Sequence, residues 1–265
     1  MSALHQLARV RRDADGVAHI VGMSGGKDST GLGLRLRELH PDVPYTFICT
    51  PTGDELPEMV EHWRKCEDLL GQPILFLTAP DGKGGALTLK KLIDGFGALP
   101  NFRQRWCTRK LKIEPTEAFM LALAAAGPAV LYVGLRADEE ERQGLFWSGA
   151  TVFPMRTWGW READVWAYLA RRGVTIPRRS DCARCYHQKL VEWKVLGEEH
   201  PDLYAEAVAQ EAAIGHTFRS PGRDTWPASL AELAVAFASG KKVRGEEAYR
   251  ARVQRGEAPC RVCSL

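Results

Sequence analysis

Residues 19–31 read HIVGMSGGKDSTG, and this stretch decides the fold class. The apolar run Val17–Met23 predicts a strand that ends at glycines, and leucines at helical spacing predict a helix over Asp28–Leu39. Glycines allow a tight turn and a close approach of backbone N–H groups to a ligand, and a helix N-terminus favours an anion. The stretch therefore predicts a phosphate-binding loop made of Ser24, Gly25, Gly26, Lys27, Asp28, Ser29 and Thr30.

The rest of the first half alternates strand and helix signals. Strands are predicted at Pro44–Thr50, Pro73–Thr78 and Ala129–Gly134, and helices at Glu55–Leu70 and Pro115–Ala126. Apolar strands that alternate with amphipathic helices are typical of a parallel sheet covered on both faces. The sequence therefore predicts an α/β fold.

The second half carries helix signals alone beyond about residue 155. Helices are predicted at Glu162–Arg172, at Lys189–Leu196 continuing into Asp202–Ile214, and at Ala228–Ala238. Proline and arginine interrupt the pattern near Ile176–Ser180. We expect a nucleotide-binding domain over residues 1–178 and a smaller helical extension over residues 179–265.

Composition narrows the class of protein. The chain has 265 residues, 45% hydrophobic and 26% charged, which is ordinary for a globular protein. Its net charge of +3 does not by itself indicate a nucleic-acid binder. No signal peptide and no run of about 20 apolar residues is present, so we expect a soluble, cytoplasmic protein without a membrane partner. The seven cysteines are odd in number and favour metal binding or redox chemistry over a disulfide framework.

The glycine loop matches neither common nucleotide-binding pattern. A Walker A loop needs G-x-x-x-x-G-K-[ST], and the dinucleotide fingerprint needs G-x-G-x-x-G. Instead, Ser24–Ser29 (SGGKDS) resembles the PP-loop, S-G-G-x-D-S, of the ATP pyrophosphatases. The resemblance implies the adenine nucleotide α-hydrolase fold, which is Rossmann-like, and a loop that holds the pyrophosphate of ATP while the α-phosphorus is attacked.

Three further segments resemble the phosphoadenosine phosphosulfate (PAPS) reductase family within that superfamily. Residues 50–58 (TPTGDELPE) are similar to its D-T-G-x-x-x-P-E turn, and residues 103–115 (RQRWCTRKLKIEP) to its C-T-x-x-x-K-x-x-P segment. Residues 133–142 (VGLRADEEER) are similar to its G-x-R-x-x-E-x-x-R turn. The resemblance implies nucleotide contacts by Thr52, Gly53, Arg136 and Arg142.

Each segment also has a structural interpretation. Asp54 can serve as the cap of the following helix, and residues 138–141 can begin a solvated helix. Arg109 and Lys112 are three residues apart, so they share a face of an α-helix and could hold phosphate or sulfate. Cations at a helix N-terminus oppose the dipole, which favours this functional interpretation over a solvated helix.

The cysteines form two C-x-x-C pairs, Cys182–Cys185 and Cys260–Cys263, with Cys107 as a fifth candidate. The leading hypothesis is a [4Fe–4S] cluster held by four of these five, and the resemblance supports it. A structural Zn²⁺ and redox-active thiols without metal are the alternatives, because the spacing alone does not separate them. Cys49 and Cys66 are predicted to be buried core residues.

The leading functional hypothesis is an ATP pyrophosphatase that activates an acceptor for sulfur transfer, using ATP with Mg²⁺. Lys27, Asp28, Ser29, Arg109 and Lys112 would serve the phosphates, and Cys263 is a candidate sulfur carrier. A sulfur donor protein such as a cysteine desulfurase and a DNA or tRNA acceptor are the expected partners. The resemblance is closest to a phage and bacterial branch that resembles the sulfur-transfer proteins of DNA phosphorothioation.

Two alternatives remain open. A PAPS or adenylyl-sulfate reductase would use a thiolate to release sulfite, but the C-terminus lacks the E-C-G-x-H segment typical of those enzymes. A nucleic-acid-modification subunit would bind ATP without turning it over. The basic segment Lys241–Arg255 could then contact a phosphate backbone, although its three glutamates favour a solvated helix.

Overall fold

The computed structural model describes residues 6–142 and 149–255. Within these residues the sheet has five strands, all parallel, in the order β3-β2-β1-β4-β5. The strands are β1 (Ala18–Gly22), β2 (Thr46–Cys49), β3 (Ile74–Phe76), β4 (Ala129–Tyr132) and β5 (Ala150–Val152). Chain order runs outward from β1 to β3 and then resumes on the other side at β4. The carboxyl end of β1 is therefore the switch point, where open α/β sheets bind ligands.

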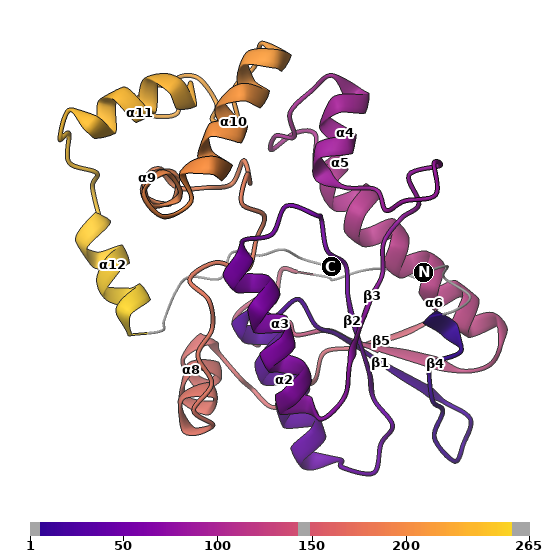
Figure 1. The fold of residues 1–265 in the computed structure, drawn as a ribbon. Coiled ribbons are helices and arrows are strands. Elements are labelled where there is room, and N and C mark those ends of the chain that lie inside the picture. The colour runs from indigo at the N-terminus through magenta and orange to yellow at the C-terminus, as the bar shows by residue number, and fades with distance from the viewer. Residues whose placement is uncertain (1–5, 143–148, 256–265) are drawn as a thin grey trace.

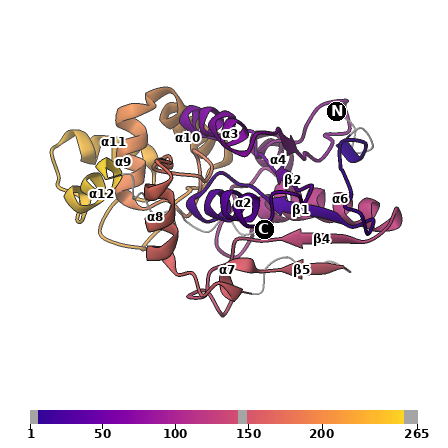
Figure 2. The same cartoon turned by 90° about the horizontal axis from the view of Figure 1, so that it is seen from below.

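Helices follow each of the first three strands and dominate the second half. They are α2 (Lys27–Leu39), α3 (Pro57–Leu70), α4 (Leu89–Phe96), α5 (Trp106–Thr108), a π-helical turn (Arg109–Ile113), α6 (Glu114–Ala125), α7 (Pro154–Thr157), α8 (Glu162–Arg171), α9 (Leu190–Glu199), α10 (Pro201–Ile214), α11 (Leu230–Ala238) and α12 (Glu246–Gln254). Figures 1 and 2 show α9 to α12 grouped beside the sheet, at the side opposite the N-terminus.

The strands send alternate side chains to two cores. Val21 and Phe47 pack on one face with α2 and α3, whereas Ile20 and Ile48 pack on the other face with Met120 of α6. The first core continues into the C-terminal helices through Trp193, Tyr204 and Leu230. The domain boundary expected near residue 178 stays a prediction.

Several predicted elements differ from the structure. The prediction that one helix continues into the next between residues 189 and 214 is wrong, because α9 ends at Glu199 and α10 begins at Pro201. Pro201 has no N–H group, and His200 before it has a non-helical conformation (φ −134°, ψ 64°). The short strand β5 and helix α4 were not predicted. A signal for α4 existed, since Thr88 caps it and leucines recur at helical spacing.

No helix in the described ranges is both long enough and apolar enough to span a membrane.

Candidate nucleotide and cysteine site

The glycine loop joins β1 to α2 in a conformation that only glycine accommodates well. Gly25 has φ +81°, in the left-handed region, and Gly26 is the N-cap of α2. A Cβ atom on Gly25 would lie 2.3 Å from Cε of Met59 and 2.8 Å from the Trp63 ring. Helix α3 therefore packs directly beneath the loop, and the loop is held against it.

Serine hydroxyls fix the loop from inside. The Gly25 N–H donates to Ser29 Oγ at 3.1 Å, and Ser29 Oγ donates to the Gly26 carbonyl at 3.1 Å. Ser24 Oγ lies 3.0 Å from Ser29 Oγ, and Trp63 Nε1 donates to the Ser24 carbonyl at 2.9 Å. Thr30 is buried with its hydroxyl 3.9 Å from Cys66 Sγ, toward the core. The loop is thus preorganised by its own residues.

Asp28 is the centre of an ion-pair group at the start of α2. Its Oδ2 accepts hydrogen bonds from Lys27 Nζ and from Arg136 Nη1, each at 2.9 Å. Lys27 Nζ also lies 3.7 Å from Glu162 Oε1, and the Lys27 side chain is 2% exposed. Oδ1 of Asp28 is buried without a hydrogen-bond partner among the described residues. A buried carboxylate oxygen of this kind fits a cation or an ordered water.

Strand β4 brings the arginine turn to this group. A Cβ atom on Gly134 would lie 3.2 Å from the backbone of Asp28, so these two segments of the chain are in contact. Arg136 also donates from Nε to Asp138 at 2.9 Å, and Arg142 pairs with Glu139 at 2.5 Å. The expectation of a solvated helix start at residues 138–141 is wrong, because the structure has turns there. Asp138 and Glu139 instead pair with Arg136 and Arg142.

The turn after β2 is closed by Glu55, which sequence reasoning did not single out. Both the N–H and the hydroxyl of Thr52 donate to Glu55 Oε1 at 2.6 Å, and the Gly53 N–H donates to Oε2 at 3.0 Å. Thr52 Oγ1 also lies 3.2 Å from Cys182 Sγ. The first cysteine pair is therefore attached to this turn.

Asp54 does not cap the following helix, which was the structural interpretation of this segment. Helix α3 begins at Pro57, and its N-cap is Leu56. The Asp54 carboxylate instead accepts hydrogen bonds from the N–H of Arg184 at 3.0 Å and from its Nε at 2.7 Å, and both side chains are buried. This ion pair holds the Cys182–Cys185 turn against the carboxyl edge of the sheet. Arg184 lies inside the C-x-x-C motif, and nothing in the local sequence indicated its distant partner.

A small cavity gathers three separate parts of the sequence. It measures about 30 Å³, room for about one water. Its lining includes Ser24 from the glycine loop, Lys112 from the basic segment and Cys182 from the first cysteine pair. The structure thus brings the loop, one predicted cation and one predicted thiol to a single place, with Glu55 and Cys49 beside them.

Arg109 is not among the residues that line this cavity. Residues 109–113 form a π-helical turn, so a spacing of three does not align Arg109 with Lys112 as it would on an α-helix. The Arg109 side chain is 75% exposed and pairs with Glu114 at 3.2 Å. The expectation of a shared helical face is therefore wrong.

Three of the five candidate ligand cysteines lie in the described part of the chain. Cys107, Cys182 and Cys185 are half-buried. Burial raises the pKa of Tyr186 to about 12, and Arg105, Cys107 and Cys185 are close enough to contribute. Residues 6–142 and 149–255 contain no group of three or more His, Cys, Asp or Glu side chains arranged to hold a metal. Cys260 and Cys263 lie outside the described residues, so the four-cysteine site stays a prediction.

The other two cysteines are core residues, as expected. Cys49 is 5% exposed and Cys66 1% exposed. Burial raises the pKa of both thiols, that of Cys66 to about 11. Neither thiol is therefore ionised near neutral pH.

A search of curated proteins finds no match. The crystal structure of PAPS reductase from Candida auris, in a phosphate complex, matches with TM-score 0.45 and 16% identity, over 66% of this chain and 79% of that one. The U34-tRNA thiolase NcsA from Methanococcus maripaludis, with its [4Fe-4S] cluster, matches with TM-score 0.44 and 13% identity, over 87% of this chain and 85% of that one.

The family is established by a direct match to the sequence. The family model described as the phosphoadenosine phosphosulfate reductase domain covers residues 18–178, which is more than half of the 265 residues. The matched range runs from β1 through α8 and contains the glycine loop, Lys112 and Arg136. The chain belongs to the phosphoadenosine phosphosulfate reductase domain family.

Proposed function

We propose that this chain is an ATP pyrophosphatase that activates an acceptor for sulfur transfer. The observation that carries the proposal is that the cations around Asp28 are already paired with carboxylates. Lys27 and Arg136, the cations nearest the glycine loop, are already paired with the carboxylates of Asp28, Glu162 and Asp138. A bare polyanion would find little uncompensated positive charge there. A nucleotide that brings its own divalent cation would find Oδ1 of Asp28, which accepts no hydrogen bond from any residue that the structure describes.

The residues fit Mg²⁺, which prefers carboxylate and phosphate oxygens. Asp28 would hold the ion, which would supply neutralisation of the phosphate charge. The chain's own groups would bind and orient the nucleotide. The amides at the start of α2 and the Ser24 and Ser29 hydroxyls would cradle the pyrophosphate, while Lys112 would add a cation from the other side of the cavity. Thr52, Gly53 and Arg142 would contribute to nucleotide binding around this centre.

The reaction has two steps. An acceptor oxygen attacks the α-phosphorus of ATP, pyrophosphate leaves, and the acceptor becomes an adenylate. A persulfide then attacks the carbon that bears the adenylate, the carbon–oxygen bond breaks, and AMP leaves with the electron pair. A second thiol reduces the remaining S–S bond and ends as a disulfide, which releases the thiolated acceptor. The position of Cys182 supports the proposal of this second step, because Cys182 lines the same cavity as Ser24. A donor protein such as a cysteine desulfurase would supply the sulfur.

An iron–sulfur cluster or Zn²⁺ is a separate proposal. The described residues alone do not form such a centre, and no step of the reaction is routed through it. Anaerobic purification followed by iron, sulfide and zinc analysis tests it. Four cysteines of the five candidates should be needed for metal retention, and a protein that holds no metal under these conditions removes the cluster from the proposal.

Calorimetry tests the nucleotide. We expect ATP with Mg²⁺ to bind at micromolar strength, about −8 kcal/mol, and PAPS and adenylyl sulfate at least tenfold more weakly. Asp28→Asn and Ser29→Ala should weaken ATP binding, whereas Ser239→Ala, at an exposed serine in the C-terminal helices, should not. Preference for a sulfonucleotide would instead favour a reductase. ATP binding without AMP formation, even with acceptor and sulfur donor present, would favour a non-catalytic subunit.

A further inference from the structure

The C-terminal helices enclose a basic cavity that the proposed chemistry does not use. It measures about 730 Å³ and lies between the start of α9, the loop after α10 and helix α12. Its lining contains five basic side chains and one acidic side chain, Asp224. The basic residues are Lys189, Arg219, Arg223, Arg244 and Arg252.

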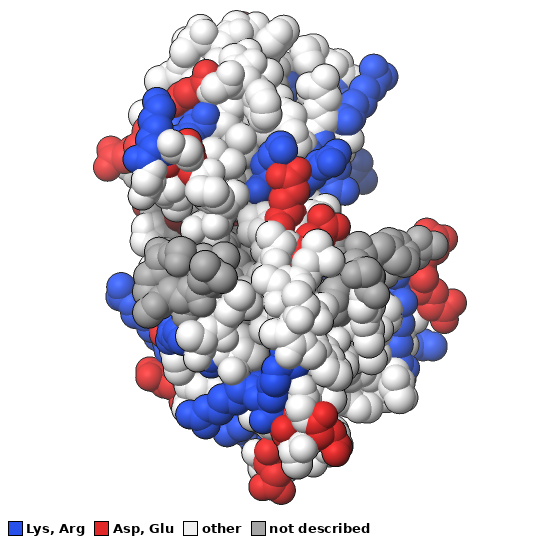
Figure 3. Space-filling model, turned by 90° about the vertical axis from the view of Figure 1, so that its right-hand side faces the viewer, with Lys and Arg blue, Asp and Glu red and all other residues white. Residues whose placement is uncertain are grey.

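Most of this positive charge is uncompensated. Arg219 pairs with Asp224 at 2.7 Å, but the other four cations form no ion pair with any described residue. The face drawn in Figure 3 is different, because there the basic residues occur in separate groups beside acidic ones. Positive charges gathered around a cavity whose lining holds a single acidic side chain attract an anionic ligand.

Two buried polar atoms at the cavity also lack partners. Arg219 is 2% exposed and Tyr249 7% exposed, yet Nε of Arg219 and the hydroxyl of Tyr249 have no hydrogen-bond partner among the described residues. Both residues line the cavity. Unsatisfied buried donors are costly, so their presence at one cavity indicates a polar ligand that accepts hydrogen bonds.

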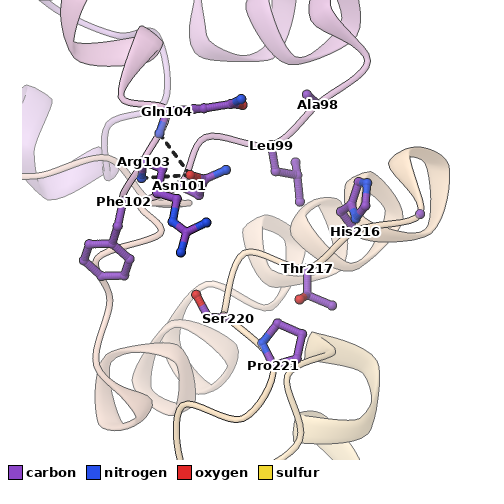
Figure 4. Close-up of a pocket in the computed structure, with 11 residues that line it drawn as sticks. Ala98, Leu99, Asn101, Phe102, Arg103, Gln104, His216, Thr217, Ser220 and Pro221 are labelled. Carbon is purple, nitrogen blue, oxygen red and sulfur yellow. Dashed lines mark hydrogen bonds between the residues drawn. The ribbon is translucent and has the colours of Figure 1, made fainter.

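A second pocket lies next to the first. It measures about 590 Å³ and is lined by Ala98, Leu99 and residues 101–104 on one side and by the loop after α10 on the other, as Figure 4 shows. Phe102, 51% exposed, and Arg103 belong to it. The guanidinium of Arg223, which lines the first cavity, lies 5.8 Å from the Phe102 ring centroid. Arg223 therefore links the two pockets.

Aromatic rings continue from the second pocket to the cysteines. The Phe102 ring lies 5.3 Å from that of Tyr186 and 4.7 Å from that of His187. These two residues directly follow Cys185 in the sequence. In the first cavity Trp226 provides a further ring, with Lys241 Nζ at 4.2 Å from its centroid. Basic and aromatic groups thus extend from α12 to the first cysteine pair.

We propose that this surface, defined by Arg244, Arg252, Trp226, Arg223 and Phe102, binds a single-stranded nucleic acid. Separated cations match successive phosphates, and the exposed ring of Phe102 matches an unstacked base, whereas a duplex hides its base faces. Two linked pockets suit consecutive nucleotides better than one small anion. The strand would present a base at the Cys182–Cys185 turn. The inference rests on the proposed function, because it names the strand as the acceptor of the sulfur. Binding of the strand itself needs no ATP.

Fluorescence anisotropy with a labelled 20-nucleotide strand, as RNA and as DNA, tests the inference in the absence of ATP. Binding should weaken with salt, with a slope of log K against log salt of about −3 for four phosphate contacts. Arg244→Gln combined with Arg252→Gln should weaken binding about tenfold and reduce the slope by about 1.4. Phe102→Ala should weaken binding about tenfold with little change in slope.

The control is Arg9→Gln combined with Arg11→Gln, which removes two exposed arginines at the opposite side of the molecule. It should change neither affinity nor slope. Equal losses in both double variants, or equal affinity for a blunt duplex, would overturn the inference. No strand binding while ATP still binds would also overturn it and leave the proposed function standing. Strand binding without ATP binding would contradict the proposed function and leave this inference standing.

Discussion

Arg136 donates a hydrogen bond from Nη1 to Oδ2 of Asp28 at 2.9 Å, across 108 residues of sequence. The contact joins the turn after β4 to the first turn of α2. Their side chains are 11% and 20% exposed, so solvent screens the pair only in part. This ion pair sets the position of the Asp28 carboxylate at the start of α2, beside the proposed phosphate site.

A double-mutant cycle measures that pair. Arg136→Gln and Asp28→Asn, alone and combined, should give a coupling of about 1–3 kcal/mol in the free energy of unfolding, measured with urea. The control cycle uses Glu61 and Lys65, an i,i+4 pair on α3 whose side chains are 62% and 63% exposed. Its coupling should stay below about 0.5 kcal/mol, since exposed pairs contribute little. Equal couplings in the two cycles would mean that the Arg136 contact is not formed.

Gly25→Ala should destabilise the protein by about 3 kcal/mol. Alanine would adopt a left-handed conformation and would also overlap Met59 and Trp63. Gly71→Ala is the matched control, because Gly71 has φ +67° but no atom within 4 Å of a Cβ. It should cost only the backbone strain, about 1 kcal/mol. Urea unfolding of both variants checks the difference, and similar losses would show that the loop is not packed on α3.

The local part of this site was predictable from sequence, because it is short-range. One strand, two glycines and one helix N-terminus occur within residues 19–31, and their conformations follow from neighbouring residues. The burial of Cys49 and Cys66 followed from apolar periodicity in the same way. Arg136 was named only through the family resemblance, and its partner Asp28 could not be derived from spacing.

The remainder depends on contacts between distant segments. Arg184 reaches Asp54 over 130 residues, and this pair rather than a helix cap explains the buried carboxylate. The π-helical turn at Arg109–Ile113 separates two cations that an α-helix would align. Such features result from packing against the rest of the chain, which overrides local preference.

Cysteine reactivity should follow burial. In metal-extracted protein at pH 8, iodoacetamide should modify the half-buried Cys107, Cys182 and Cys185 faster than Cys66, which is 1% exposed and whose pKa burial raises to about 11. Mass spectrometry of tryptic peptides over time measures each rate. Labelling in urea provides the control, because all cysteines should then react alike. Equal rates in the native protein would contradict the buried position of Cys66.

His62 should make stability depend on pH. Burial lowers its pKa from 6.5 to about 4, so the unfolded state takes up a proton first as the pH falls. The contribution of His62 to the free energy of unfolding is therefore constant above pH 6.5. It is lost between pH 6.5 and 4, by about 3 kcal/mol in total. Carboxylates with lowered pKa values act mainly below pH 4.5, but burial raises the pKa of Asp54 and of Glu211, so the difference in slope between the wild type and His62→Gln, measured between pH 7 and 5, reports the histidine. His62→Gln should flatten this range, whereas His40→Gln, at an exposed site, should keep the slope. A slope that survives His62→Gln would assign the dependence to another group.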